Sequence, residues 1–228
     1  MICGRFKIIL KPKISVVIPP VAGLYAITPN INDTPILLEK TEQALSGGVK
    51  ILQYRNKQAS LILAYRQAQA LRKLTRNYEA ALIINDSVQL AQESNADGVH
   101  LGHEDGDFAL ARQKLPGKLI GVSCYNSIER AAKAVAAGAN YIAFGSFYPS
   151  ATKPKAAQAT RELIVEARAR FAVPIVAIGG ITVDNAAPLI ESGVNAIAVV
   201  SALFDTANIA ETAKQFAALF DNHHVRYK

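Results

Sequence analysis

Two basic residues lie two positions apart in a polar run that follows an apolar stretch of the chain. Arg55 and Lys57 come directly after the mainly apolar run at residues 49–54. Side chains two positions apart in an extended chain share one face, so both cations can reach the same ligand. Paired cations suit a diphosphate or triphosphate group. The simpler interpretation, a solvated strand end, stays open.

Two acidic residues, Asp86 and Asp105, also follow short apolar runs. Carboxylates from two neighbouring connections can converge on one hard cation. Mg²⁺ takes one or two carboxylates and completes its shell with water and phosphate oxygens. An Asp at such a place is also a common helix N-cap, so metal binding and capping remain alternatives for each residue.

Small and hydroxyl-bearing residues follow several other apolar runs. Gly179 and Gly180 free backbone N–H groups to approach a phosphate, and Ser201 stands at a comparable place after the last run. The segment 145–154 combines small, hydroxyl and proline residues with Lys153, which fits either a loop that closes over a ligand or an ordinary surface connection. Ser123 ends another run and can donate a hydrogen bond.

The histidines and cysteines indicate no nucleophile or zinc site. His100 lies inside an apolar run, as a packed core residue would, and His103 follows it. Cys3 and Cys124 have neither metal-ligand spacing nor the pattern of a disulfide framework. No Ser-His-Asp or Cys-His arrangement is apparent. We therefore expect a protein of the reducing cytoplasm.

These polar residues need a scaffold that gathers the ends of many strands. Eight apolar runs of strand length recur at residues 24–27, 49–54, 81–84, 98–101, 119–123, 141–144, 174–178 and 196–200. Such runs are typical of strands buried on both faces of a parallel sheet. Helix-forming residues fill the segments between them, such as 61–76, 127–137 and 159–170. The alternation predicts a single (βα)8 TIM barrel, an α/β fold whose active site lies in the loops after the strands.

An open, doubly wound sheet is the main alternative fold. It would want a glycine-rich phosphate fingerprint after the first strand, where Thr28 and Pro29 stand instead. Helix-length segments also end repeatedly in a glycine turn before the next strand, as at Gly47, Gly138 and Gly193. Repeated units of one geometry favour the closed barrel.

Length, composition and charge fit one globular domain. The chain has 228 residues, of which half are hydrophobic and 19% are charged. We expect a basic arm at residues 1–20, the barrel at 21–220 and a short tail at 221–228.

The net charge is +7, but the arm holds four basic residues and no acid, which leaves 21 basic against 18 acidic residues elsewhere. Because these are scattered, we expect no nucleic-acid partner. No apolar run reaches the roughly 18 residues that span a bilayer, so we expect no membrane partner either.

The ordered set of motifs resembles the thiamine phosphate synthase family. The resemblance runs from about Leu24 to Phe204 and rests on residues 53–57, 84–86, 98–105, 121–123, 148–154, 178–182 and 199–202. The glycine pair alone would be weak, because many phosphate-binding barrels have one. The whole set, in the right order and at matching strand ends, is specific.

The resemblance implies an enzyme that joins a hydroxymethylpyrimidine diphosphate to a thiazole phosphate, giving thiamine phosphate and pyrophosphate. Asp86 and Asp105 would ligate Mg²⁺, and the catalytic residues would be Arg55, Lys57, Ser123 and Lys153. The pyrimidine diphosphate would be held by Gln53, Arg55, Lys57, Asn85, Ser123 and Lys153, with Tyr54 and Asn56 completing the substrate site. The thiazole phosphate would be held by Ser150, Ala151, Thr152, Gly180, Val200 and Ser201. The implied mechanism is dissociative, so the protein needs no nucleophile of its own.

Several positions depart from the family pattern. Asn56 stands where an acid is common, which puts the affinity of the diphosphate site in doubt. His103 replaces a usual Gln, and Tyr125 stands where a His often follows the Ser by two. Ser146 replaces a frequent Pro, and Ser150 a frequent Thr. No proposed metal ligand is lost.

Three alternatives to the synthase stay in view. A thiazole tautomerase on the same fold is expected to lack the paired metal acids and to use the His that Tyr125 replaces. A non-catalytic binder of thiamine intermediates is expected to lose the acids or the basic residues. The third alternative is an unrelated phosphosugar isomerase or aldolase barrel. An aldolase would want a Lys inside a strand, where the predicted runs offer only Lys50, at a strand start. The sequence leaves the oligomeric state open, a homo-oligomer included.

Overall fold

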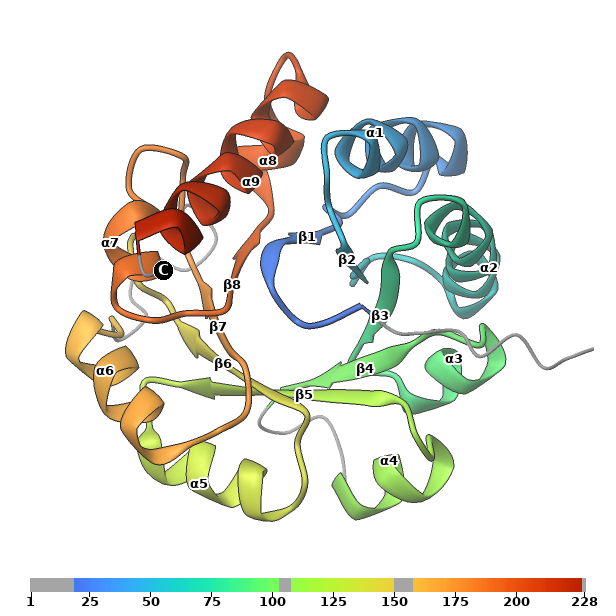
Figure 1. Cartoon of the computed structure of the whole chain (residues 1–228). Coiled ribbons are helices and arrows are strands. Elements are labelled where there is room, and N and C mark those ends of the chain that lie inside the picture. The colour runs from blue at the N-terminus through green and yellow to red at the C-terminus, as the bar shows by residue number, and fades with distance from the viewer. Residues whose placement is uncertain (1–18, 103–107, 150–157, 227–228) are drawn as a thin grey trace, which may run out of the picture.

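The strands form one closed barrel (Figure 1) in the computed structural model, which describes residues 19–102, 108–149 and 158–226. Eight parallel strands follow one another around the barrel in chain order, and pairing of β8 with β1 closes it. The helices cover the outside of the sheet. The prediction of a (βα)8 barrel is confirmed.

Each predicted apolar run coincides with one strand, with ends shifted by no more than two residues. The strands are β1 (Gly23–Ile27), β2 (Ile51–Tyr54), β3 (Ala81–Asn85), β4 (Gly98–Leu101), β5 (Leu119–Tyr125), β6 (Tyr141–Gly145), β7 (Ile175–Ile178) and β8 (Ala196–Val199). β5 is longer than expected because it continues past a shift in its register with β6, between Ser123 and Tyr125.

The helices that cover the barrel differ in length, and short ones follow several of the strands. They are α1 (Thr34–Ser46), α2 (Leu61–Asn77), α3 (Val88–Glu93), α4 (Phe108–Lys114), α5 (Ile128–Ala136), α6 (Arg161–Arg170), α7 (Ala187–Glu191), α8 (Ser201–Phe204) and α9 (Ile209–Arg226). Residues 221–226, expected as a tail, continue α9 because no glycine or proline interrupts it.

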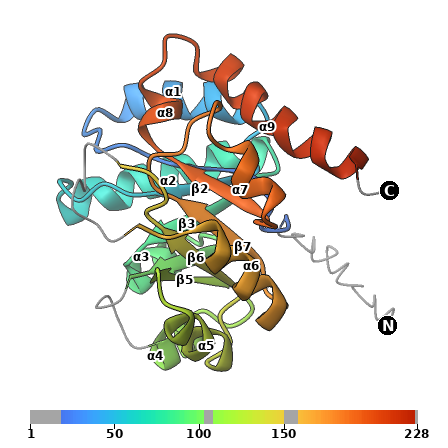
Figure 2. The same cartoon turned by 90° about the vertical axis from the view of Figure 1, so that its left-hand side faces the viewer.

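The two ends of the barrel carry different parts of the chain. In the side view, the connections that lead from strands into α1 and α2 lie at the left (Figure 2). The first described residues and the end of α9 lie at the right. The strand-to-helix connections, which carry the expected site residues, therefore lie away from the described ends of the chain.

Two apolar cores hold the barrel together. One fills its interior and includes Tyr25, Ile51, Ile83 and Tyr141. The other lies between the sheet and the surrounding helices. Gly121 makes room inside the barrel, because a Cβ at this position would lie 1.9 Å from Cζ of the Tyr141 ring. Successive residues of each strand alternate between the two cores, as in other parallel barrels.

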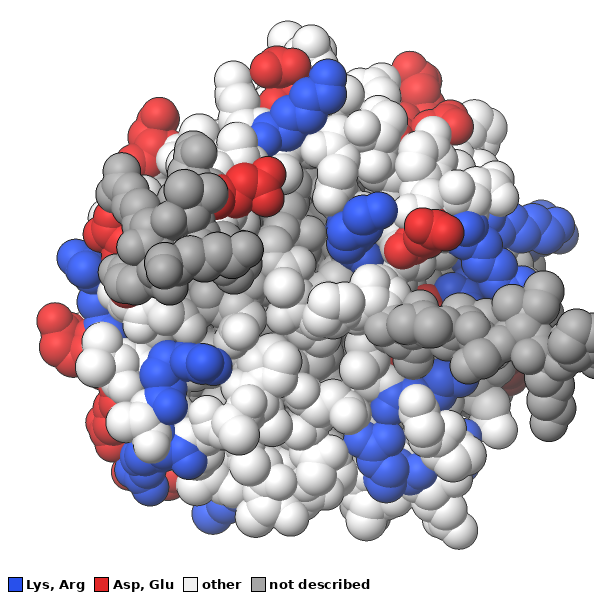
Figure 3. Space-filling view, in the orientation of Figure 1, with Lys and Arg blue, Asp and Glu red and all other residues white. Residues whose placement is uncertain are grey.

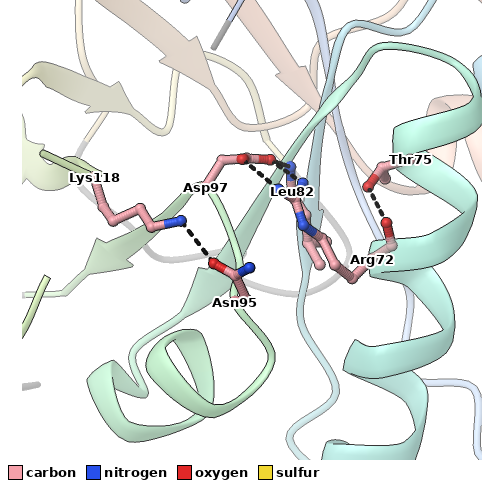
Figure 4. Close-up of polar contacts among 6 residues, drawn as sticks. All are labelled: Arg72, Thr75, Leu82, Asn95, Asp97 and Lys118. Carbon is pink, nitrogen blue, oxygen red and sulfur yellow. Dashed lines mark hydrogen bonds and ion pairs between the residues drawn. The ribbon is translucent and has the colours of Figure 1, made fainter. Parts of the chain in front are cut away.

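A buried ion pair fixes α2 to the start of β4. The guanidinium of Arg72 donates to both carboxylate oxygens of Asp97, with Nη2 2.8 Å from Oδ1 (Figure 4). The same carboxylate accepts the backbone N–H of Leu82 in β3 at 2.8 Å. Nearby, Lys118 Nζ donates a hydrogen bond of 3.0 Å to Asn95 Oδ1. Because Asp97 precedes its strand, the pair belongs to the end of the barrel that serves stability in this fold.

The surface charges are mixed in sign on the face seen in Figure 3. Lys and Arg side chains, and Asp and Glu side chains, are scattered around a mainly uncharged centre, and no continuous basic stripe crosses the part of this face that is drawn in colour. Across residues 19–102, 108–149 and 158–226, none of the helices has the length and apolar character needed to cross a bilayer.

Candidate active site

Polar side chains from three strands enter the carboxyl end of the barrel. Ile51 and Ile83 belong to the interior core, and the residues two positions further along, Gln53 and Asn85, share their face of the sheet. Ser123 of β5 lies at the same end of the barrel, where its hydroxyl is 2.8 Å from Nε2 of His100 in β4. The structure therefore brings together the three neutral residues expected at the pyrimidine half-site.

The backbone at Arg55 is held by the connection after β1. The buried hydroxyl of Thr28 donates to the carbonyl oxygen of Arg55 at 3.0 Å and accepts its N–H at 2.9 Å. The amide oxygen of Asn30 accepts the N–H of Lys57 at 3.1 Å. These bonds fix the backbone at the end of β2 from which the two cationic side chains extend, although neither Thr28 nor Asn30 carries a signal of this role in the sequence.

Asp86 does not cap the helix that follows it. Ser87 is the N-cap of α3, because its hydroxyl accepts the N–H of Leu90 at 3.1 Å. Asp86 Oδ2 instead accepts a hydrogen bond of 2.6 Å from the Asn85 amide and lies 3.7 Å from Lys57 Nζ. The backbone at Asp86 is left-handed, with φ of 61°, a conformation that Asp adopts more readily than most residues. Of the two alternatives for Asp86, capping is therefore wrong.

A cleft lies between the beginnings of α2 and α3. Lys57, Tyr65, Asp86 and Gln89 are among the residues that line it. Its position beside the ends of β2 and β3 places it next to the expected diphosphate half-site.

Two residues expected at the substrate site, Tyr54 and Asn56, are engaged with the surrounding elements. The Tyr54 hydroxyl donates to Gln67 Oε1 of α2 at 2.7 Å, and its ring packs in the outer core. The Asn56 amide donates to the carbonyl oxygen of Ile31 at 3.0 Å, and its oxygen accepts the N–H of Gln58 at 3.1 Å. Both residues line the cleft, but these bonds tie their polar groups to the scaffold. A carboxylate at position 56 could not make the same donation to Ile31.

The glycine pair after β7 packs against the chain that follows β6. A Cβ at Gly180 would lie 2.6 Å from the carbonyl oxygen of Pro149, and one at Gly179 would overlap Ser146. Both glycines also have positive φ. The Tyr148 N–H donates to the carbonyl oxygen of Gly179 at 3.0 Å. Close packing and backbone conformation therefore require glycine here, and both hold residues 146–149 against the end of β7.

The last strand contributes Val200 and Ser201. Val200 packs against the interior core and precedes α8, which begins at the exposed Ser201. The α8 backbone is tied to α1, because Lys40 Nζ donates to the carbonyl oxygen of Phe204 at 2.9 Å. These two residues thus lie at the same end of the barrel as Gly180.

Several expected site residues lie outside the described part of the chain. They are Asp105, Ser150, Ala151, Thr152 and Lys153. Within the described ranges, no three His, Cys, Asp or Glu side chains are grouped closely enough to hold a metal. Asp86 is therefore the one proposed Mg²⁺ ligand whose surroundings can be described.

Sequence reasoning missed two tyrosines inside the barrel. Tyr25 and Tyr141 are hydrogen-bonded to each other at 2.9 Å, and Tyr141 also contacts His100. Tyrosine in an apolar strand resembles ordinary core, so the sequence carried only the weak signal that polar atoms there need partners.

Comparison with known sequences gives matches over most of the chain. The family model of thiamine monophosphate synthase matches residues 24–203. The thiamine-phosphate synthase of Methylobacillus flagellatus is 52% identical over 205 residues, which are 90% of this chain and 98% of that protein. The thiamine-phosphate synthase of Aromatoleum aromaticum is 48% identical over 200 residues, covering 87% of this chain and 96% of the relative.

Comparison with solved structures also gives matches over most of the chain. Thiamine phosphate pyrophosphorylase from Pyrococcus furiosus superposes with a TM-score of 0.80 at 33% identity, covering 89% of this chain and 96% of its own. The corresponding protein from Bacteroides thetaiotaomicron has a TM-score of 0.65 at 20% identity, with 89% and 99% coverage, which supports the fold alone.

Proposed function

The chain belongs to the thiamine monophosphate synthase family and is an enzyme that forms thiamine phosphate, and on that premise we propose which of its residues bind each substrate. The pyrimidine diphosphate occupies the half-site made by β2, β3 and β5. The thiazole phosphate lies toward β7 and β8, where Gly180, Val200 and Ser201 stand, together with Ser150, Ala151 and Thr152. The observation that carries this division is that Gln53, Asn85 and Ser123 enter the same end of the barrel, where Asn85 donates to Asp86 of the Lys57–Asp86 pair.

The charges at the first half-site suit a diphosphate leaving group. Hydrogen bonds to Thr28 and Asn30 hold the backbone N–H groups of Arg55 and Lys57 at the end of β2, so the points from which both cationic side chains extend are set before substrate arrives. Fixed cations stabilise the negative charge that grows on pyrophosphate as its bond to the pyrimidine carbon breaks. Lys153, from the loop after β6, is proposed to add a third cation.

The carboxylate of Asp86 fits a magnesium ion. It is an oxygen ligand at the barrel mouth, hydrogen-bonded to the Asn85 amide and beside the cation of Lys57. We propose that Asp86 and Asp105 together hold Mg²⁺, whose remaining ligands would be water and phosphate oxygens. When bound, the ion would supply positive charge that makes pyrophosphate a better leaving group.

The proposed reaction is dissociative. The bond between the pyrimidine methylene carbon and the diphosphate oxygen breaks, and its electrons leave with pyrophosphate. The thiazole nitrogen then donates its lone pair to the resulting pyrimidine cation. No strand among the described residues contains a lysine for a Schiff base. The protein's part is to orient both substrates and to neutralise the leaving group.

A pyrophosphate-release assay with both substrates tests the proposal. It would be run with and without Mg²⁺, and thiamine phosphate would be identified by its mass. Mg²⁺-dependent formation of thiamine phosphate is expected. Equal rates after complete metal removal would overturn the metal assignment and leave the substrate half-sites to be tested separately.

We also propose a cytoplasmic location. Cys124 is a buried free thiol, and both substrates are phosphorylated metabolites that do not cross membranes unaided.

A further inference from the structure

An unbroken line of hydrogen bonds crosses the inside of the barrel. Gln53 Nε2 donates to the Tyr25 hydroxyl at 2.9 Å, and the Tyr25 and Tyr141 hydroxyls are 2.9 Å apart. The Tyr141 hydroxyl lies 3.1 Å from His100 Nδ1, and His100 Nε2 lies 2.8 Å from Ser123 Oγ. We call these five residues the interior chain. Its two ends, Gln53 and Ser123, are both proposed substrate ligands.

The interior chain is enclosed by protein. Tyr25 and Tyr141 are 1% and 0% exposed, and His100 is 8% exposed. The His100 ring stacks on Tyr141, with centroids 5.6 Å apart, and Gly121 leaves no spare room beside the Tyr141 ring. A buried donor without a partner is costly, so the hydroxyl protons of Tyr25 and Tyr141 and the imidazole proton of His100 must each point to the next member of the interior chain.

The proton order follows from its first bond. Because Gln53 donates to Tyr25, Tyr25 keeps its own proton for Tyr141. Tyr141 then directs its proton to His100 Nδ1. A neutral imidazole that accepts at Nδ1 carries its proton on Nε2, so His100 donates to Ser123. In the reverse order, the Tyr25 hydroxyl proton would point at the amide protons of Gln53, and neither donor would have an acceptor.

The groups of the interior chain are neutral near pH 7. Burial lowers the pKa of His100 to about 4 and raises the pKa of Tyr25 to about 12. Burial also raises the pKa of Tyr141 well above its ordinary value. A neutral chain has one fixed direction rather than a mobile charge.

We propose that the interior chain positions the substrate-facing groups at its two ends, presenting Gln53 as an acceptor and Ser123 as a hydroxyl donor. Gln53 has its amide nitrogen turned inward, so its oxygen is left for the substrate. Ser123 accepts from His100, so its own proton is left for the substrate. An acceptor and a donor facing one substrate site match an aminopyrimidine, whose amino group donates and whose ring nitrogens accept. Tyr25, Tyr141 and His100 are positioning residues in this scheme, which rests on the proposed substrate roles of Gln53 and Ser123.

Removing one link of the interior chain tests the proposal. Tyr141→Phe keeps the ring and removes the hydroxyl, and Tyr78→Phe is the matched control, because the Tyr78 hydroxyl contacts Glu42 on the outer helices. We expect Tyr141→Phe to lower kcat/KM for the pyrimidine diphosphate roughly tenfold, the usual effect of one hydrogen bond. KM for the thiazole phosphate and the behaviour of Tyr78→Phe should stay as in the wild type.

A double-mutant cycle separates positioning from packing. If Tyr141 acts through Ser123, adding Tyr141→Phe to Ser123→Ala should cause little further loss. Discrimination between the aminopyrimidine diphosphate and its 4-oxo analogue, which inverts the donor and acceptor, should also fall about tenfold in Tyr141→Phe. Additive losses with unchanged discrimination would show that Tyr141 only packs, and would overturn the proposal.

Nitrogen NMR of the histidines gives a readout that does not need activity. The resonances of His100 can be assigned by their absence in His100→Asn. We expect the Nε2–H tautomer in the wild type, whereas the Nδ1–H tautomer would reverse the interior chain and overturn the proposal.

The proposed function fails in a distinguishable way. If the proposed substrate roles are wrong, Gln53→Ala and Ser123→Ala would leave pyrimidine diphosphate binding unchanged. The positioning role of the interior chain would then be wrong as well. Effects of Gln53→Ala and Ser123→Ala without any effect of Tyr141→Phe would overturn the interior chain alone.

Discussion

Lys57 and Asp86 face each other from two neighbouring strand-to-helix connections, with Lys57 Nζ 3.7 Å from Asp86 Oδ2. The side chains are 58% and 28% exposed, and ion pairs with this much solvent contact add little to stability. The pair therefore has a better explanation in ligand binding than in folding. In the proposed site, Lys57 would bind phosphate and Asp86 would bind the divalent ion beside it.

Asp86→Ala should impair turnover through loss of the proposed metal ligand. We expect kcat/KM to fall by about 10²–10³-fold, as on loss of a preorganised electrostatic group, and the dependence on Mg²⁺ to weaken. Ser87→Ala is the control, because Ser87 caps α3. It should lower the free energy of unfolding by about 1 kcal/mol and leave turnover intact. Wild-type activity of Asp86→Ala across a Mg²⁺ titration would contradict the assignment.

Gly180→Ala should weaken the thiazole phosphate half-site. The new methyl group would lie 2.6 Å from the Pro149 carbonyl oxygen, so residues 148–149 must move. We expect KM for the thiazole phosphate to rise several-fold in steady-state assays. Gly138→Ala is the matched control, because Gly138 has φ of 93° but nothing within 4 Å of its Cβ position. Equal effects of both variants on KM would show that backbone strain, not loop packing, is responsible.

The sequence predicted the barrel well because its signal is spread over many residues. Eight buried runs and the turns between them each indicate the same architecture, so an error at one strand end, such as Tyr125, does not change the result. The continuation of α9 beyond Phe220 was missed because polar residues at a helix end resemble a tail.

Site residues depend on single side chains, and there the sequence was less decisive. Asp86 and Ser87 are both good capping residues, and only the hydrogen bond from Leu90 shows which of them caps. Tyr54 and Asn56 have the right position along the chain, but their hydrogen bonds point to α2 and to the connection after β1. Tyr25 and Tyr141 are distant in sequence, so no local pattern reveals their contact.

The Arg72–Asp97 pair should stabilise the fold without acting in the reaction. Asp97→Asn leaves a buried guanidinium without its charge partner, which typically costs about 3–5 kcal/mol. We expect a lower free energy of unfolding in urea and unchanged KM values in the fraction that stays folded. Adding Arg72→Met should restore part of the loss, since no buried charge then remains unpaired. A double variant no more stable than Asp97→Asn would contradict this account.

Cys124 should make stability fall at alkaline pH. The side chain is buried in the outer core, and burial raises the thiol pKa from 9.0 to about 12. Above pH 9 the unfolded chain loses this proton while the folded protein keeps it. The unfolded state then binds fewer protons, so stability declines as pH rises from about 9 toward 12.

The comparison of Cys124→Ala with the wild type isolates the thiol. The raised pKa values of Tyr25 and Tyr54 act in the same direction in both proteins, so their effects cancel in the difference. The free energy of unfolding would be measured at pH 7.5 and at pH 10. Cys124→Ala should be less stable at both, because it leaves a cavity, but its decline between them should be smaller by about 1 kcal/mol. An equal decline in both proteins would mean that the thiol ionises alike in the folded and unfolded states, and that its burial is not maintained in solution.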